Sequence, residues 1–373
     1  MKKSVITALT TLACIIGAMV LVTGCTGGAD PHEEIAQADE IEVVEAPAAV
    51  EVEEPEPEPE EEPIADIYVP AGMLETATTD ELLNYLNVET RVDEIRKAAE
   101  EEKPIAQFIL GIMYSVGRGV EQDYEQMATW YRLSAEQDIP RAMAYIGWAY
   151  RMGNGVEQSY EEALHWHRLA IEHGNLVGKI EMGLMYQLGQ GVEQSYVQAA
   201  YWYRLAAEQG NASGQRRLGY MYQQGNSVEQ SYDNAEHWFR LAAVQGYAQA
   251  QGDLGFFYAS GLGVDQDNEQ AVYWTRLSAE QGNAMAQHNM GYLYARGNGV
   301  AQNLESAAHW FSLSSEQGVS SASWFLGSLF YGGNFEGEFD RDLEQALYWH
   351  RRAVEQGNPH SESWVVHIER LLG

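Results

Sequence analysis

Midway along the chain stand two stretches, MGLMYQLGQGV (residues 182–192) and AAYWYRLAAEQG (residues 199–210), that together decide the fold. Comparable stretches recur over the second part of the chain with a period of 36 residues. The period is marked by seven aligned glycines, Gly111, Gly147, Gly183, Gly219, Gly255, Gly291 and Gly327. A tryptophan follows each of the first six after nineteen residues, whereas Trp349 comes three residues late because of an insertion within 334–341. A fixed period of this length is typical of a solenoid, in which each unit packs against its neighbours.

One unit, residues 142–174, shows how the sequence specifies two helices. Ala142, Ile146 and Tyr150 stand at helical spacing and predict a first helix, which ends at two glycines that permit left-handed backbone angles. Ser159, with Glu162 three residues later, is typical of a capping box that begins a second helix. Similar pairs recur as Asp123/Gln126, Ser195/Gln198, Ser231/Asn234, Asp267/Gln270 and Asp342/Gln345. We therefore expect a helix–turn–helix in every unit.

The aligned glycine needs an explanation, because glycine inside a helix costs about 1 kcal/mol relative to alanine. Its repetition indicates that the two helices of a unit approach so closely that a methyl group has no room. The tyrosine that follows the glycine after three residues, and the recurring tryptophan, are expected to fill the neighbouring space. We assign these recurring residues to structure and not to ligand binding.

The pattern Gly-x-x-Tyr-x-x-Gly-x-Gly-Val, followed by Ala-x-x-Trp-Tyr-Arg-x-Ala-Ala-Glu-Gln-Gly, resembles the Sel-one-like repeat, a relative of the tetratricopeptide repeat. The resemblance implies an all-α fold, a right-handed superhelical solenoid of seven helix–turn–helix repeats with capping helices at both ends and a concave groove. One cysteine-rich branch of this family is associated with penicillin binding and β-lactam hydrolysis. Its disulfide in every repeat is absent here, because only Cys14 and Cys25 are present. That activity is therefore not carried over.

The first residues indicate export and lipidation. Residues 1–24 combine two lysines with an apolar run, and Val22-Thr23-Gly24 precede Cys25 as in the lipobox of bacterial lipoproteins. The resemblance implies that Cys25 carries the lipid and that the protein is sorted to the outer membrane, facing the periplasm. An uncleaved membrane anchor and a plain signal peptide are the alternatives.

Residues 25–79 have the composition of a disordered tether. Sixteen Asp and Glu residues and no Lys or Arg lie within 30–66, and seven of the ten prolines lie within 31–70. Such a composition predicts an extended spacer between membrane and folded domain. A docking motif for a basic partner is the alternative. We then expect a capping half-repeat over 80–106, seven repeats over 107–359 and a closing helix over 360–373.

Positions that differ between the repeats are the candidates for a specific site. The positions three before and one after the aligned glycine share one face of the first helix. They predict an aromatic stripe of Trp148, Tyr220, Phe256 and Tyr292, with Arg216, Arg217, His288 and Trp324 beside it. Aromatic residues and Arg are the usual anchors of protein interfaces. The alternative is that these aromatics only pack between adjacent repeats.

The remaining features favour a protein-binding role. The net charge of −33 argues against nucleic acid, because binding to phosphates needs clustered Lys and Arg. The sequence predicts no catalytic residue, no cofactor and no metal site: His165 and His167, two apart on a helix, diverge. We expect a lipid-anchored scaffold that holds a protein or peptide in its groove. A glycan-binding module or an envelope hydrolase is the alternative.

Overall fold

The computed structural model describes residues 67, 69, 73–74, 77–226, 228–332 and 339–373. All of them lie in one compact unit that runs from Glu60 to Gly373. The secondary structure of this described part is entirely helical, and none of its helices is long and apolar enough to cross a membrane. The expected signal peptide, Cys25 and nearly all of the tether lie outside the described residues.

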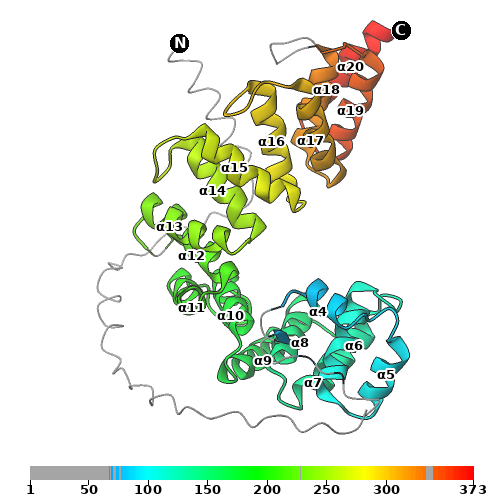
Figure 1. The fold of residues 1–373 in the computed structure, drawn as a ribbon, viewed down its shortest axis with the longest axis vertical. Coiled ribbons are helices and arrows are strands. Elements are labelled where there is room, and N and C mark those ends of the chain that lie inside the picture. The colour runs from blue at the N-terminus through cyan, green and yellow to red at the C-terminus, as the bar shows by residue number, and fades with distance from the viewer. Residues whose placement is uncertain (1–66, 68, 70–72, 75–76, 227, 333–338) are drawn as a thin grey trace, which may run out of the picture. The chain divides into compact units, whose positions relative to one another are not determined.

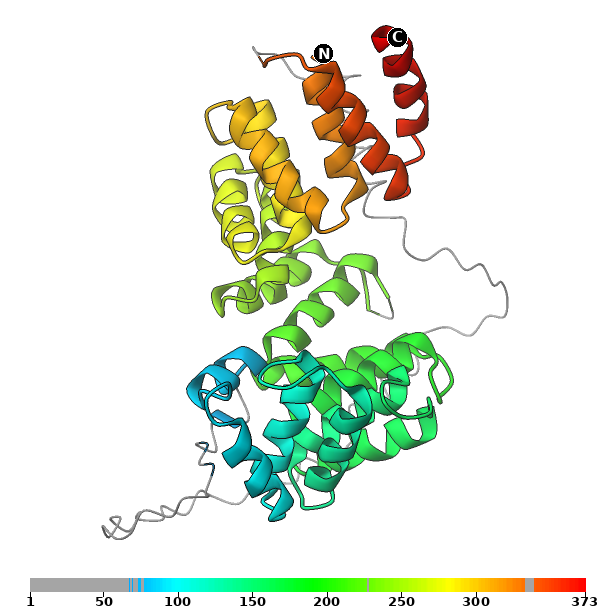
Figure 2. The same ribbon diagram turned by 90° about the vertical axis from the view of Figure 1, so that its right-hand side faces the viewer.

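Seven helix pairs follow one another along this unit, as the repeat predicts (Figures 1 and 2). The first helices, called A helices below, are α6 (Pro104–Val116), α8 (Pro140–Met152), α10 (Leu176–Leu188), α12 (Ala212–Gln224), α14 (Ala248–Ser260), α16 (Ala284–Arg296) and α18 (Ser320–Tyr331). The second helices, the B helices, are α7 (Tyr124–Ala135), α9 (Tyr160–Glu172), α11 (Tyr196–Glu208), α13 (Tyr232–Val244), α15 (Asn268–Glu280), α17 (Leu304–Glu316) and α19 (Leu343–Glu355). Each helix packs against the next in the chain, so the fold is an all-α solenoid.

The loops and caps are those that the sequence predicts. Each A helix ends at a glycine in the left-handed region, for example Gly189 with φ 68°. The side chain of Ser195 then accepts a hydrogen bond from the backbone of Gln198 and begins the B helix. The same bond is present at the other five predicted caps. A complete capping box also has the reciprocal hydrogen bond, from the backbone of the capping residue to a side chain in the first turn of the helix. That bond is present at Thr78, before the first described helix.

The aligned glycines mark a close approach within each repeat, but the residue that they approach is not the tryptophan. A methyl group on Gly183 would lie 2.6 Å from the ring of Tyr203, the residue after Trp202. Its equivalents at the other glycines are Tyr131, His167, Phe239, Thr275, Phe311 and His350. The expectation that the tryptophan fills this space is therefore wrong. The ring that follows it points at the glycine and is buried, while Trp202 is half-buried.

Two polar ladders join successive repeats. A B-helix arginine donates to the tyrosine hydroxyl of the next A helix, as in Arg132 to Tyr150 (2.6 Å) and Arg240 to Tyr258 (2.7 Å). A buried A-helix glutamine, such as Gln251, donates to a backbone carbonyl of the preceding B helix (3.2 Å) and accepts from Gln281 (2.7 Å). Because buried polar groups need partners, these bonds stabilise one spacing between repeats.

Further helices lie at both ends of the array. Before the first repeat come α4 (Thr79–Tyr85) and α5 (Val92–Glu100), and α5 packs against α6. After the last repeat, α20 (Ser361–Leu372) packs against α19. The terminal pairs of the array are thus packed against a further helix at either end.

Candidate protein-binding groove

The predicted aromatic stripe lies on the A helices, which carry the candidate groove. Tyr220 of α12 is 38% exposed, and Trp148, Phe256 and Tyr292 are half-buried. Half-burial has a cause in each case: Trp148 packs against the core of the first repeats, and Tyr292 lies 6.1 Å from the ring of Phe325 in the next repeat. Three members of the stripe thus contribute to inter-repeat packing, and Tyr220 is its most exposed member.

Arg216 and Arg217 lie beside Tyr220 but have different contacts. Arg216 forms an ion pair with Asp253 of the next A helix, with its Nε 2.5 Å from Oδ2. Burial raises the pKa of Asp253, and the Arg216 guanidinium opposes that rise. Arg217 lies over the ring of Tyr203, 5.6 Å from its centroid. The pair links α12 and α14, so it stiffens the surface on which Tyr220 stands.

His288 corrects the sequence analysis. It is 1% exposed, and its ring packs against the stacked rings of Phe311 and Phe325, with its centroid 5.6 and 5.5 Å from theirs. Burial lowers its pKa to about 4, and its Nε2 has no hydrogen-bond partner. Trp324 is half-buried with its Nε1 also unpartnered, and its ring packs on Phe325. His288 therefore belongs to the packing between the last two repeats and is not part of an accessible groove.

Four apolar side chains of the A helices are more exposed than the predicted stripe, and they include Val116 of α6 (48%) and Met285 of α16 (39%). Met152 and Leu188 stand five residues after the aligned glycines of α8 and α10, and they are 48% and 50% exposed. The equivalent positions in the next three A helices hold Gln224, Ser260 and Arg296. A search for positions that vary between repeats would have identified both residues if it had included the position one helical turn further along each A helix.

The chain itself covers the beginning of the A-helix face. Ile67 and Val69 are 6% and 4% exposed, and the carbonyl of Leu74 accepts a hydrogen bond from Arg141 of α8 (3.0 Å). The Arg141 guanidinium also lies over the rings of Phe108 and Tyr145.

This contact has a consequence for the groove. Phe108, Ile112 and Ala144 occupy the groove positions of the first two repeats, and each is 0% exposed. The groove positions of the first two repeats are therefore closed as far as Trp148, although Val116 at the end of α6 is 48% exposed.

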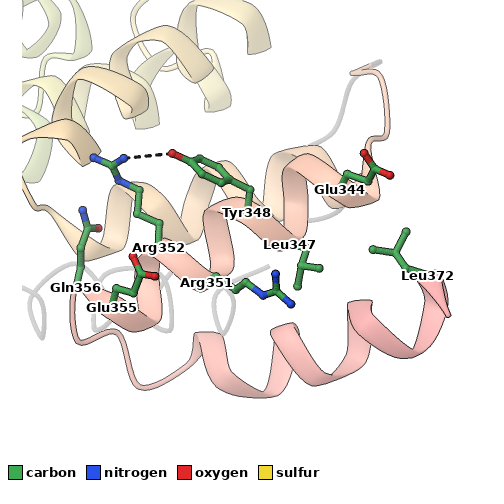
Figure 3. Close-up of a pocket in the computed structure, with 8 residues that line it drawn as sticks. All are labelled: Glu344, Leu347, Tyr348, Arg351, Arg352, Glu355, Gln356 and Leu372. Carbon is green, nitrogen blue, oxygen red and sulfur yellow. Dashed lines mark hydrogen bonds between the residues drawn. The ribbon is translucent and has the colours of Figure 1, made fainter.

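A second hollow lies at the other end of the array, between α19 and α20, with a volume of about 690 Å³. Figure 3 shows Glu344, Tyr348 and Glu355 of α19 along it, with Leu372 of α20 opposite. Arg351 spans the two helices through an ion pair with Glu369 (2.7 Å). The hollow is open and mixed in polarity.

The titratable residues of the described part of the chain bear on a possible metal site. Its His, Cys, Asp and Glu residues form no group of three that could hold a metal ion. His165 is exposed whereas His167 faces Gly147 in the core, so the two histidines do diverge. Burial, with repulsion from Arg151, lowers the pKa of His167 to about 3, and neither ring nitrogen has a partner.

Comparison with known proteins gives a consistent picture. Seven consecutive segments match the family model described as Sel1 repeat, over residues 104–139, 140–175, 178–211, 212–247, 248–283, 284–319 and 320–358. Among solved structures, the chain is similar to a protective antigen present in uropathogenic Escherichia coli strains that displays an SLR fold (37% identity, TM-score 0.57). That match covers 77% of this chain and 61% of the length of the antigen.

A Sel1 repeat protein from Oxalobacter formigenes is similar as well, with 29% identity and a TM-score of 0.57, over 79% of this chain and 83% of that protein. No curated protein matches the chain.

Proposed function

The chain belongs to the Sel1 repeat family, and from this premise we propose that it is an interaction scaffold whose A-helix face binds a protein or peptide partner. Proteins of this family generally mediate protein–protein interaction. The observation that carries the proposal is the group of exposed apolar side chains on consecutive A helices, Met152, Leu188 and Tyr220, on a rigid support. Solvent-facing apolar side chains on neighbouring elements are typical of docking surfaces.

The electrostatics of this face support a specific partner. Arg151 and Glu181 pair across α8 and α10 (3.0 Å), and Arg216 and Asp253 pair across α12 and α14. Both pairs are largely removed from solvent and lie next to the exposed apolar residues. Charges that are already paired hold the helices in place, so a partner meets a preformed surface and loses less free energy to ordering.

We also propose that the scaffold is displayed at the periplasmic face of the outer membrane through a lipid on Cys25. The support is the lipobox-like sequence before Cys25 and the acidic, proline-rich stretch that follows it. Palmitate labelling tests this directly: Cys25→Ser is expected to abolish the label and to release the protein from membranes. Persistent labelling or membrane retention of that variant would contradict the lipid anchor.

The binding proposal is tested by site-specific photocrosslinking in intact cells with the full-length chain. A photoreactive amino acid at Tyr220 is expected to give one discrete protein adduct. The matched control is the same group at Leu371, which is 49% exposed on α20. Smears of equal intensity from both positions, or no adduct from Tyr220, would overturn the proposal. An adduct that a glycosidase removes would instead support glycan binding.

A further inference from the structure

A row of exposed rings runs along the B helices, away from the candidate groove residues. The residue before each recurring tryptophan is aromatic from the second repeat onward: His165, Tyr201, His237, Tyr273, His309 and Tyr348. All six are exposed, with the three tyrosines at 50%, 54% and 51%. Each ring packs tilted or edge-on against its tryptophan, with centroids 4.9 to 5.6 Å apart. We call this row the ring ladder.

Exposed carboxylates flank the ladder. Positions four before and seven after each ring share its helix face. In five of these six repeats the earlier position is acidic (Glu161, Asp233, Glu269, Glu305 and Glu344), and in five the later one is (Glu172, Glu208, Glu280, Glu316 and Glu355), all of them exposed. The exceptions are Val197 and Val244. Most B helices thus present a ring between two carboxylates on one surface.

The arginines of the B helices do not neutralise this surface to the same extent. Arg132, Arg204, Arg240 and Arg276 donate to tyrosine hydroxyls of the next A helix, and so point into the seam between repeats. The ladder therefore combines aromatic rings with a negative potential. Both attract cations, the rings through their quadrupole and the carboxylates through charge.

The last repeat shows this chemistry within the chain itself. Its residue three after the tryptophan is Arg352, where the first six repeats have leucine. The Arg352 guanidinium lies 5.7 Å from the centroid of the Trp349 ring and donates to the Tyr348 hydroxyl (3.3 Å), as the dashed line in Figure 3 shows. A guanidinium is therefore already bound beside the ring at the end of the ladder. Without that internal arginine, the other repeats of the ladder offer a tyrosine with its tryptophan at Tyr201 and Tyr273, and a histidine with its tryptophan at the remaining three positions.

We propose that the ring ladder docks an extended, Arg- or Lys-rich segment of a partner protein. A basic side chain of such a segment would meet a ring and a flanking carboxylate in each repeat that the segment crosses. This surface is separate from the A-helix face, so either proposal can fail without the other.

The test measures binding of a fluorescein-labelled (Arg-Gly-Ser)₆ peptide to the full-length chain by fluorescence anisotropy at 0.15 M salt. The perturbed variant replaces three neighbouring rings, as Tyr201→Leu, His237→Leu and Tyr273→Leu. The matched control replaces the same three residues by Phe and so keeps a ring at each position. We expect the leucine variant to bind roughly five- to thirty-fold more weakly, from the two exposed cation–π contacts of Tyr201 and Tyr273. The phenylalanine variant should stay within about two-fold of the wild type.

Three further measurements keep the outcome decisive. Both variants are compared by circular dichroism, because in a partly unfolded leucine variant weaker binding could not be assigned to the missing rings. If the leucine variant is partly unfolded, Tyr201→Leu is compared with Tyr201→Phe in place of the triple variants. Glu208→Gln with Glu280→Gln should weaken binding and reduce its salt dependence, whereas Tyr220→Ala should leave it unchanged. Equal affinity of the leucine and phenylalanine variants would overturn the proposal, because general charge attraction alone would then explain binding. Ring-dependent binding of an N-acetylglucosamine tetramer, without ring-dependent peptide binding, would overturn it in favour of a glycan.

Discussion

Two glycines one turn apart in α14 allow the close-approach argument to be tested within a single helix. Gly255 is one of the aligned glycines, and Gly252 is not. A methyl group on Gly255 would clash with Thr275 Oγ1 and would lie 2.9 Å from the Thr275 backbone nitrogen and 3.2 Å from the carbonyl oxygen of Ala271. A methyl group on Gly252 would meet Ser278 Oγ at 3.1 Å and otherwise only ordinary contacts near 3.8 Å.

The severity of the clash decides whether alanine raises or lowers the free energy of unfolding at each of the two positions. Alanine is favoured over glycine in a helix interior by about 1 kcal/mol, and overpacking of a core costs about 1–3 kcal/mol. At Gly255 the clash involves backbone atoms that cannot rotate away, so the upper end of that range applies. We expect Gly255→Ala to lower the free energy of unfolding by about 2 kcal/mol. Gly252→Ala, which needs only a small shift of Ser278, should be neutral or stabilising by up to about 1 kcal/mol.

Urea denaturation followed by far-ultraviolet circular dichroism measures the difference between the two variants. Both changes lie in one repeat, so any departure of the array from two-state unfolding affects them alike. The expected difference of about 2–3 kcal/mol should appear as a clear separation of the midpoints. A Gly255→Ala protein as stable as Gly252→Ala would refute the close approach as the reason for the aligned glycine.

Two more predictions concern buried polar groups. Burial lowers the pKa of His167 to about 3 and those of His288 and His350 to about 4, so below pH 6.5 the unfolded chain takes up protons that the folded chain does not. As the pH is lowered from about 6.5 to 4, the free energy of unfolding should therefore fall by about 1.4 kcal/mol per pH unit for each histidine. Denaturation series at stepped pH should show a smaller slope of unfolding free energy against pH for His167→Phe than for the wild type. An equal slope would contradict the assignment. Gln251→Leu removes two hydrogen bonds, one to the Ala243 carbonyl and one from the Gln281 amide, but that carbonyl still accepts from the Gly246 N–H and that amide still donates to the Leu277 carbonyl. The change should therefore destabilise the protein by about 0.5–1.5 kcal/mol in thermal or urea unfolding, whereas an unchanged midpoint would show that the glutamine ladder contributes little.

The sequence predicts the repeat architecture well because each helix boundary is encoded locally. Glycines such as Gly189, and capping residues such as Ser195, act within a few residues, so their roles follow from spacing alone. The partner of the aligned glycine was harder to predict. It is the residue after the tryptophan, which is Tyr203 in one repeat and Thr275 in another, so the contact recurs while the residue type does not. The recurring residue in the sequence is the tryptophan, whereas the residue that contacts the glycine is the one after it.

The candidate groove was only partly predictable because its exposure depends on contacts between distant residues. His288 occupies a groove position in the alignment of repeats, yet Phe311 and Phe325 of later helices bury it. At the other end, Arg141 binds the carbonyl of Leu74, which is 67 residues earlier in the chain. Helical periodicity carries no information about either contact.

These contacts narrow the surface that a partner can use. Ile67, Val69 and Leu74 lie against the beginning of the A-helix face, and the packing around His288 closes the position near its end. Exposed apolar side chains between them include Met152, Leu188 and Tyr220, on three consecutive A helices. The same side chains that would bind a partner are supported by two inter-repeat ion pairs, so a change of repeat spacing would break the surface and the pairs together. Binding at this face is therefore expected to be coupled to the stability of the repeats that carry it, since a ligand that binds only the folded array stabilises it by mass action.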